Sequence, residues 1–302
     1  MTSIHETAYP RFKPDLTQRE LDEIYTPNET EQRFARRLGR SNASRLYLMI
    51  LLKTVQRLGY FPMVADVPPS IVSFVTKALG LKLVPLCALV EEEKSRSRRD
   101  FIDAIRAHLK IHPITKDTDK AIELAATQAA QTKQELADII NVIIEELIRQ
   151  RYELPAFSRL NRTAFRIRNQ VNELYYHTLT DPLPAAVTSQ FDAMLTLSAG
   201  QLVTGWQQIK QDPKKPTNTE VRQYLERVKW LKSWACELPQ VDHIPVVKRG
   251  QYVYEARALD AADLKAMQQN KRYALMVLLF HAQLSKAVSY THLRAHETGR
   301  NL

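Results

Sequence analysis

Glycine and cysteine are scarce in this sequence, and each shortage narrows the structures that it can form. The 302 residues include seven glycines and two cysteines. Cys87 and Cys236 lie far apart without Cys-x-x-Cys spacing, which argues against a disulfide framework and a thiolate metal site. We therefore expect a protein of a reducing, cytoplasmic compartment.

Long apolar runs are also absent. The most apolar segments, residues 46–52 and 274–280, have seven residues each, whereas a helix needs ~20 to cross a bilayer. No basic and apolar leader opens the chain, so we see no secretory signal. We expect no membrane partner.

The sequence contains no recognisable catalytic motif. We find no glycine-rich phosphate loop, no G-x-S-x-G and no H-E-x-x-H, so we assign no catalytic residue, no metal ligand and no cofactor. His108 and His112 have the i, i+4 spacing that can bind zinc on a helix, but they have no third ligand nearby and Pro113 follows. An enzyme with an unrecognised helical active site stays open as an alternative.

Helical periodicity is what the sequence does contain, and it predicts an all-α fold. A helix starts after Ser41-Asn42, ends at Gly59 and should be buried on one side. A short helix follows within residues 66–80. One long helix runs from about Asp117 to near Glu153, and two more occupy residues 218–234 and 260–287, with Thr219 and Asp260 as N-caps.

The length favours two helical domains. We place the boundary near Glu153-Leu154-Pro155, where the long helix ends. The first domain then covers residues 1–154 and the second residues 155–287. Trp230 and Trp234 have helical spacing, which favours a packed core over base stacking.

Positive charge is in excess and clustered. Lys and Arg number 43 against 33 Asp and Glu, a net charge of +10, which favours a polyanionic partner. The segment 33–57 has seven basic residues and no acid. Arg33, Arg37 and Arg40 fall at i, i+4 and i+7, so we expect them to share one helical face. Lys53 and Arg57 form an i, i+4 pair on the next helix. The residues that we expect to contact DNA in this cluster are Arg33, Arg37, Arg40, Arg45, Lys53 and Arg57. A solvated face is the alternative.

A second cluster lies in the second domain. Arg159, Arg162 and Arg166 fall at i, i+3 and i+7, and no acid follows until Glu173. We expect these three to contact DNA, and Lys214 and Lys215 to contact phosphates from a loop, although a plain exposed turn explains the two lysines equally well. Residues 91–99 mix both signs and are typical of ordinary helix surface with internal pairs.

Several segments, in this order, resemble the amino-terminal region of transposases of the Tn-three family, which are replicative unit transposons of bacteria. They are RLYLMILLKTVQRLGYF (45–61), DVPPSIVSFVTKALGL (66–81), HPITKDTDKAIELA (112–125), ELPAFSRLNRTAFRIRNQVN (153–172), PTNTEVRQYLERVKWLKSW (216–234) and the stretch 255–287. Ser73 departs from the pattern, which has histidine there.

The resemblance implies helical, helix-turn-helix-like DNA-binding domains that recognise terminal inverted repeats in double-stranded DNA. It also implies an Asp-Asp-Glu catalytic core that uses magnesium, further along a longer protein that acts as a homodimer. Nothing in this sequence matches that core, so we expect an inactive, truncated fragment. The alternative is a helical protein-interaction module whose basic surface docks an acidic partner.

The last fifteen residues, VSYTHLRAHETGRNL (288–302), lie outside the resemblance. They are similar to the translation of a sequencing-adapter sequence. We therefore expect them to be an artefact tail and exclude them, with His292 and His296, from fold and metal-site arguments.

Overall fold

The computed structural model describes residues 2–82, 84–197, 200, 202–211, 218–234 and 237–298. Over this part of the chain the regular elements are helices, and the one β-type pairing is an isolated bridge between His112 and Tyr152. The all-α prediction is therefore confirmed.

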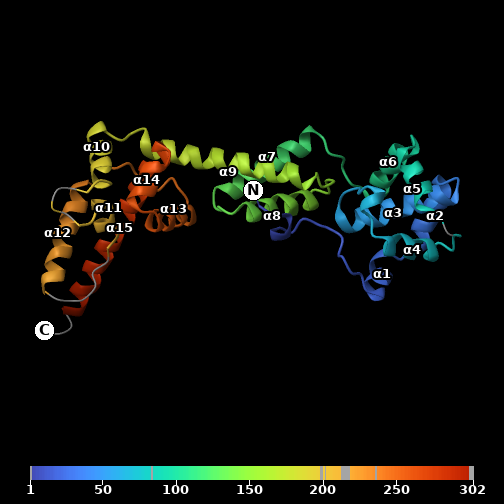
Figure 1. The fold of residues 1–302 in the computed structure, drawn as a ribbon, viewed down its shortest axis with the longest axis horizontal. Coiled ribbons are helices and arrows are strands. Elements are labelled where there is room, and N and C mark those ends of the chain that lie inside the picture. Colours follow the sequence, from blue (N-terminus) through green and yellow to red (C-terminus); the bar gives the residue numbers. More distant parts are fainter. Residues whose placement is uncertain are drawn as a thin grey trace. The chain divides into compact units, whose positions relative to one another are not determined.

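Figure 1 shows the helices in chain order. The first group, in chain order, is η1 (Ile4–Glu6), α1 (Gln18–Tyr25), α2 (Glu29–Leu38), α3 (Asn42–Leu58), η2 (Val64–Asp66), α4 (Pro69–Ala78), α5 (Leu86–Lys94), α6 (Ser97–Leu109), α7 (Lys116–Ala130) and α8 (Leu136–Arg149). The second group is α9 (Phe157–Thr180), α10 (Ala185–Met194), α11 (Gly205–Lys210), α12 (Asn218–Trp234), α13 (Val246–Ala258), α14 (Ala261–Ala266) and α15 (Gln269–Thr298).

The chain forms two compact units. Unit 1 comprises residues 1–126 and 135–165, and unit 2 comprises residues 127–134 and 166–302. The divisions between the units lie inside α7, between α7 and α8, and inside α9. The domain boundary at residue 154 and the DNA-binding role of each domain stay predictions.

Helix α3 is the centre of unit 1. Every residue from Leu46 to Val55 is buried, and α1, α2, α4, α5 and α6 all pack against this helix. The predicted helix is confirmed, but the expectation that only one side is buried is wrong. Its apolar residues point in all directions around the axis, and a helix of this kind is covered on every side.

The ends of α3 follow from local chemistry. The Ser41 hydroxyl accepts a hydrogen bond from the Ser44 backbone N–H, which caps the helix start. Gly59 ends the helix with φ of 75°, a left-handed conformation that favours glycine. A Cβ at this position would lie 3.1 Å from the Leu154 side chain, so the close approach also requires glycine.

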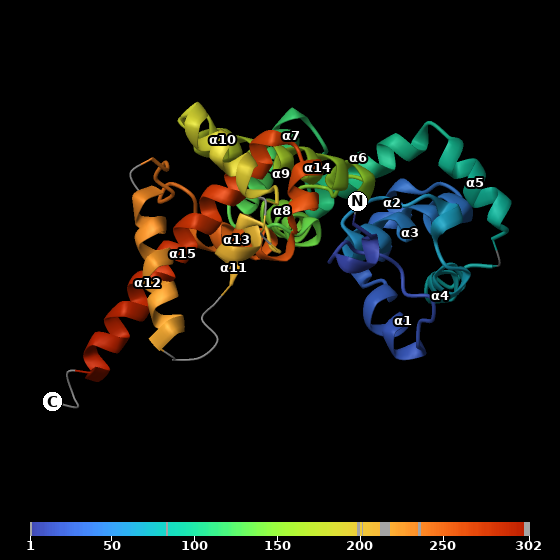
Figure 2. The ribbon, with the colours of Figure 1, turned by 60° about the vertical axis from the view of Figure 1, so that its left-hand side comes forward.

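Helix α15 is the centre of unit 2, and residues Tyr273–Phe280 of this helix are buried. Helices α12 and α15 lie side by side in both views (Figures 1 and 2). Trp234 is buried, stacks on Phe191 at 5.5 Å and packs against Phe280, while Trp230 meets Trp234 edge-on. The prediction that these tryptophans pack a core is confirmed for Trp234, whereas Trp230 is 39% exposed and lies outside the buried cluster.

Three helix predictions are corrected. The expected single helix from about Asp117 to near Glu153 is two helices, α7 and α8, because the polar residues 131–135 interrupt the apolar stripe and form a turn after Ala130. The expected helix 260–287 is also broken, since Met267 is extended between α14 and α15. Asp260 caps α14 as predicted, but Thr219 lies within α12, which starts at Asn218.

In the described part of the chain, none of the helices combines the length and the apolar character that crossing a membrane requires.

Candidate nucleic-acid interface

Helix α2 carries the first predicted arginines. Its start is capped by Asn28, whose side chain accepts from the Glu31 backbone N–H, and it ends at Leu38 because Gly39 is extended. Arg33 and Arg37 are exposed on this helix. Arg40 is exposed but lies beyond the helix end, so the predicted common face of Arg33, Arg37 and Arg40 is wrong for Arg40.

The α2 arginines are held by local contacts. Arg33 forms an ion pair with Glu29 at 2.8 Å, and Arg36 donates to the Gln32 side chain. Because the Arg33 and Glu29 side chains are 74% and 87% exposed, this pair is solvated and weak. The Arg37 guanidinium lies over the Phe34 ring, which stacks on the His108 ring at 4.6 Å.

Lys53 does not contribute to an exposed basic surface. It is 7% exposed, and its ammonium nitrogen lies 3.3 Å from a carboxylate oxygen of Glu31. Gln56 donates to the other carboxylate oxygen of Glu31 at 2.8 Å. Glu31 comes from α2, so the helical spacing of Lys53 and Arg57 along α3 gave no sign of this partner. The expectation of a DNA contact from Lys53 is corrected on this ground.

Arg45 and Arg57 lie near opposite ends of α3. Arg45 is half-buried and donates from Nε to the Gly39 carbonyl oxygen at 3.0 Å, so it ties α2 to α3. A Cβ on Gly39 would meet the Arg45 side chain at 2.6 Å, which explains the glycine. Arg57 is exposed and close to Tyr25: burial raises the pKa of Tyr25, and the Arg57 charge acts in the opposite direction.

The second predicted cluster lies on α9. Arg162 and Arg166 are exposed, and Arg159 is half-buried and paired with Asp119 of α7. Arg162 donates from Nε to the Ser158 carbonyl oxygen at 3.3 Å, and Arg166 donates to the Gln170 side chain at 3.2 Å. The charge of Arg159 is therefore opposed by a nearby carboxylate.

Lys214 and Lys215 lie outside the described residues. The side chains of the 288–302 tail are likewise not among those that the structure describes. Helix α15 continues through the backbone of this tail to Thr298. The predictions made on these residues stay predictions.

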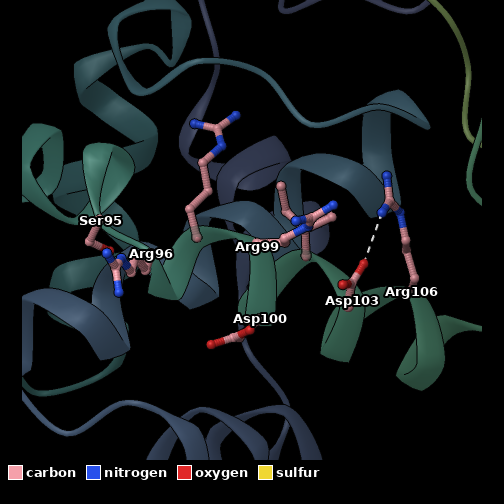
Figure 3. A pocket seen from close by; sticks show the side chains of 8 residues that line it. Ser95, Arg96, Arg99, Asp100, Asp103 and Arg106 are labelled. Carbon is pink, nitrogen blue, oxygen red and sulfur yellow. Dashed lines mark hydrogen bonds and ion pairs between the residues drawn. The ribbon is translucent and has the colours of Figure 1, made fainter.

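Four arginines line a groove at α6, which Figure 3 shows from close by. Arg98 is bound to Glu93 and to the Tyr47 hydroxyl, and Arg106 is bound to Asp103 and Glu153. The Arg98–Glu93 pair confirms that residues 91–99 form a surface with internal pairs. Arg96 and Arg99 are exposed on the same segment and were not singled out from the sequence.

The histidine pair does not have the geometry of a helical zinc site. Helix α6 ends at Leu109, and Lys110 adopts a left-handed conformation with φ of 56°. His108 is therefore on the helix whereas His112 is beyond it, where its backbone pairs with the segment at Tyr152. No group of three histidine, cysteine or carboxylate side chains suited to a metal ion is found among the described residues.

Residues 1–167 match the family described as "Domain of unknown function (DUF4158)". The chain belongs to this family. It is also 24% identical over 272 residues to the transposase for transposon Tn501 of Pseudomonas aeruginosa and 27% identical over 268 residues to the transposase for transposon Tn3926 of Escherichia coli.

These alignments cover 89% and 86% of this chain but 26% of each relative. A third relative, the transposase for transposon Tn21 of Escherichia coli, is 25% identical over 191 residues, which are 62% of this chain and 19% of that protein. The chain thus spans about a quarter of the length of the relatives that it matches. The resemblance to the amino-terminal region of Tn-three family transposases is confirmed.

Proposed function

We propose that this chain is the DNA-binding region of a replicative transposase and that it recognises the terminal inverted repeats of its element. The observation that carries this proposal is the set of exposed arginines on and beside α2, α3 and α9, in a chain whose relatives are transposases. Guanidinium groups bind phosphate oxygens with paired hydrogen bonds, so exposed arginines suit the backbone of a duplex.

The exposed set is narrower than the sequence suggested. It comprises Arg33, Arg36, Arg37, Arg40, Arg57, Arg162 and Arg166. Lys53 is left out because it is buried, and Arg45 and Arg159 are left out because they are half-buried and hold other elements of the fold. The set supports contacts with several phosphates, which fix the position of a protein on DNA without reading its sequence.

Strand cleavage and transfer belong, in this proposal, to a part of the full-length transposase that this chain does not cover. The relatives are about four times as long as the aligned region, which leaves room for a separate catalytic core. We assign the magnesium requirement to that core. In this proposal the full-length protein acts in the bacterial cytoplasm as a homodimer.

The test is a nuclease footprint on DNA that carries the terminal inverted repeats of the element encoding this chain. The proposal predicts protection confined to the repeats at protein concentrations that leave flanking DNA accessible. Equal protection of repeats and flanking DNA would show general affinity for duplexes without repeat recognition. An absence of protection at any concentration would reject DNA binding itself.

A helical protein-interaction module is the second candidate. The observation in its favour is that carboxylates already bind two of the predicted arginines, Arg33 through Glu29 and Arg159 through Asp119. An acidic protein surface would make the same contacts. Competition separates the two candidates: poly-glutamate that displaces duplex DNA at equal charge concentration favours the interaction module, whereas retention of the duplex favours the transposase role.

A further inference from the structure

Helices α2 and α3 are joined by three residues, Gly39 to Ser41, which is the connection found in a helix-turn-helix. In that motif the second helix lies in a major groove and reads base edges. Helix α3 is buried from Leu46 to Val55 and is exposed only near its ends, so it is unable to lie along a groove. Another helix of unit 1 therefore has to supply any contact between this unit and base edges.

Helix α4 has the exposed side that this role requires. The helix packs against α1 and α3 (Figure 2), and its opposite side is open. Ser70, Ser73 and Lys77 are exposed, and their spacing of i, i+3 and i+7 places them on one side of the helix. We call these three residues the α4 face.

The α4 face differs in charge from the exposed sides of the helices around it. Residues 67–90 contain Lys77 and Lys82 but no Asp or Glu. In the described part of unit 1, by contrast, α1, α2, α5, α6, α7 and α8 each expose at least one carboxylate. A duplex, which is densely charged with phosphates, therefore meets less repulsion along α4 than along those helices.

The groups around the α4 face include both hydrogen-bond donors and acceptors. The α4 face lines a hollow of unit 1 together with Gln18 and Asp22 of α1. Phosphate oxygens only accept, whereas base edges in a major groove present donors and acceptors in a pattern that differs for each base pair. Lysine binds guanine, serine binds several bases, and a carboxylate accepts from the amino group of cytosine. The composition therefore suits base edges better than phosphates.

The dimensions of α4 also suit a groove. Ser70 and Lys77 are seven residues apart on an uninterrupted helix of 10 residues. At about 1.5 Å per residue, they are separated by roughly 10 Å along the axis, the length of about three base-pair steps. The major groove is about 12 Å wide and admits an α-helix. Because the two serine side chains are short, the backbone of α4 can approach the base edges closely.

We propose that α4 reads base sequence, with the α4 face in a major groove and Lys77 bonded to a guanine. This inference rests on the proposed function, because it assumes that the chain binds duplex DNA. The exposed arginines on and beside α2 and α3 then contact the phosphate backbone, and α4 supplies the sequence preference of unit 1.

The experiment is selection of preferred sequences from a pool of randomised duplexes, followed by affinity measurements on the selected duplex. It uses the whole chain and the variants Ser73→Asn and Lys77→Ala. Lys94→Ala is the matched control, since Lys94 is an exposed lysine in the last turn of α5, as Lys77 is in the last turn of α4. Far-ultraviolet circular dichroism verifies that all variants keep the helical content of the parent.

The inference predicts a changed motif for both α4-face variants. Lys77→Ala should lose the preference for guanine at one position and bind the parent's motif roughly tenfold less tightly. Ser73→Asn should shift the preferred base at a neighbouring position to adenine, the base that asparagine binds with two hydrogen bonds. Affinity for random duplex and its salt dependence stay unchanged, and Lys94→Ala behaves as the parent.

Three results would overturn the inference. If the parent selects a motif and both α4-face variants select the same motif with the parent's affinity, α4 does not read bases while the proposed function stands. If Lys77→Ala keeps the motif but lowers the salt slope by about 0.9, Lys77 contacts a phosphate instead. A parent that binds every duplex equally, or none, rejects the inference together with the proposed recognition of terminal repeats.

Discussion

Replacement of Lys53 by methionine separates a structural role from a DNA-binding role at this position. Lys53 and Glu31 are 7% and 3% exposed, and their ion pair joins α3 to α2. Removing one member of a buried pair costs about 3–5 kcal/mol, because the other charge stays buried without its partner. We expect the lower end, about 3 kcal/mol, since Glu31 keeps its bonds from the Asn28 backbone and from Gln56.

Urea unfolding followed by circular dichroism measures this loss. Two variants calibrate it. Lys94→Met removes an exposed lysine and should change the free energy of unfolding by less than about 0.5 kcal/mol. The double change Glu31→Gln with Lys53→Met should recover part of the loss, because no uncompensated charge is left inside.

The same Lys53→Met protein should bind duplex DNA with the parent's salt dependence at temperatures where it is folded, since a buried ammonium group cannot reach a phosphate. A variant with parental stability and weakened DNA binding would refute the reasoning from burial. It would restore Lys53 to the DNA-contacting residues that the sequence suggested.

Two further predictions concern stability. Burial lowers the pKa of Lys248 to about 8. Between about pH 8 and 10 the unfolded chain therefore keeps a proton that the folded chain has released, and the free energy of unfolding should rise with pH. Lys248→Met should remove this rise in urea titrations at pH 7.5 and 9.5, and an unchanged rise would contradict the assignment. Gly59→Ala should lower the free energy of unfolding by about 1–2 kcal/mol for the left-handed conformation, and by more because the added Cβ meets Leu154. Gly80→Ala should lower it less, because Gly80 has φ of 63° but nothing within 4 Å of an added Cβ. Equal melting temperatures for the two variants would disprove the packing argument.

The sequence was sufficient for features that depend on local chemistry. The Ser41 cap, the left-handed Gly59 and the Asp260 cap were all located correctly, because each depends on one residue and the backbone beside it. The helical class followed from periodicity. The family resemblance came from the order of segments and not from any single motif.

Features that depend on contacts between helices could not be predicted. The basic stretch 33–57 contains no acid, yet the structure places Glu31 of α2, just before the stretch, beside Lys53 of α3. Asp119 likewise reaches Arg159 from forty residues away. Counting charges within a window therefore overestimated the positive charge available to a partner.

The central claim is that exposed arginines hold a DNA duplex, and the salt dependence of binding tests it most directly. For the parent, log affinity should fall linearly with log salt concentration, by about 0.9 for each phosphate neutralised. The triple variant Arg37→Ala, Arg40→Ala, Arg57→Ala should lower this slope by about 2.7, whereas Arg19→Ala with Arg149→Ala, two exposed arginines paired with carboxylates, should leave it unchanged. A triple variant with the parent's slope would contradict the account.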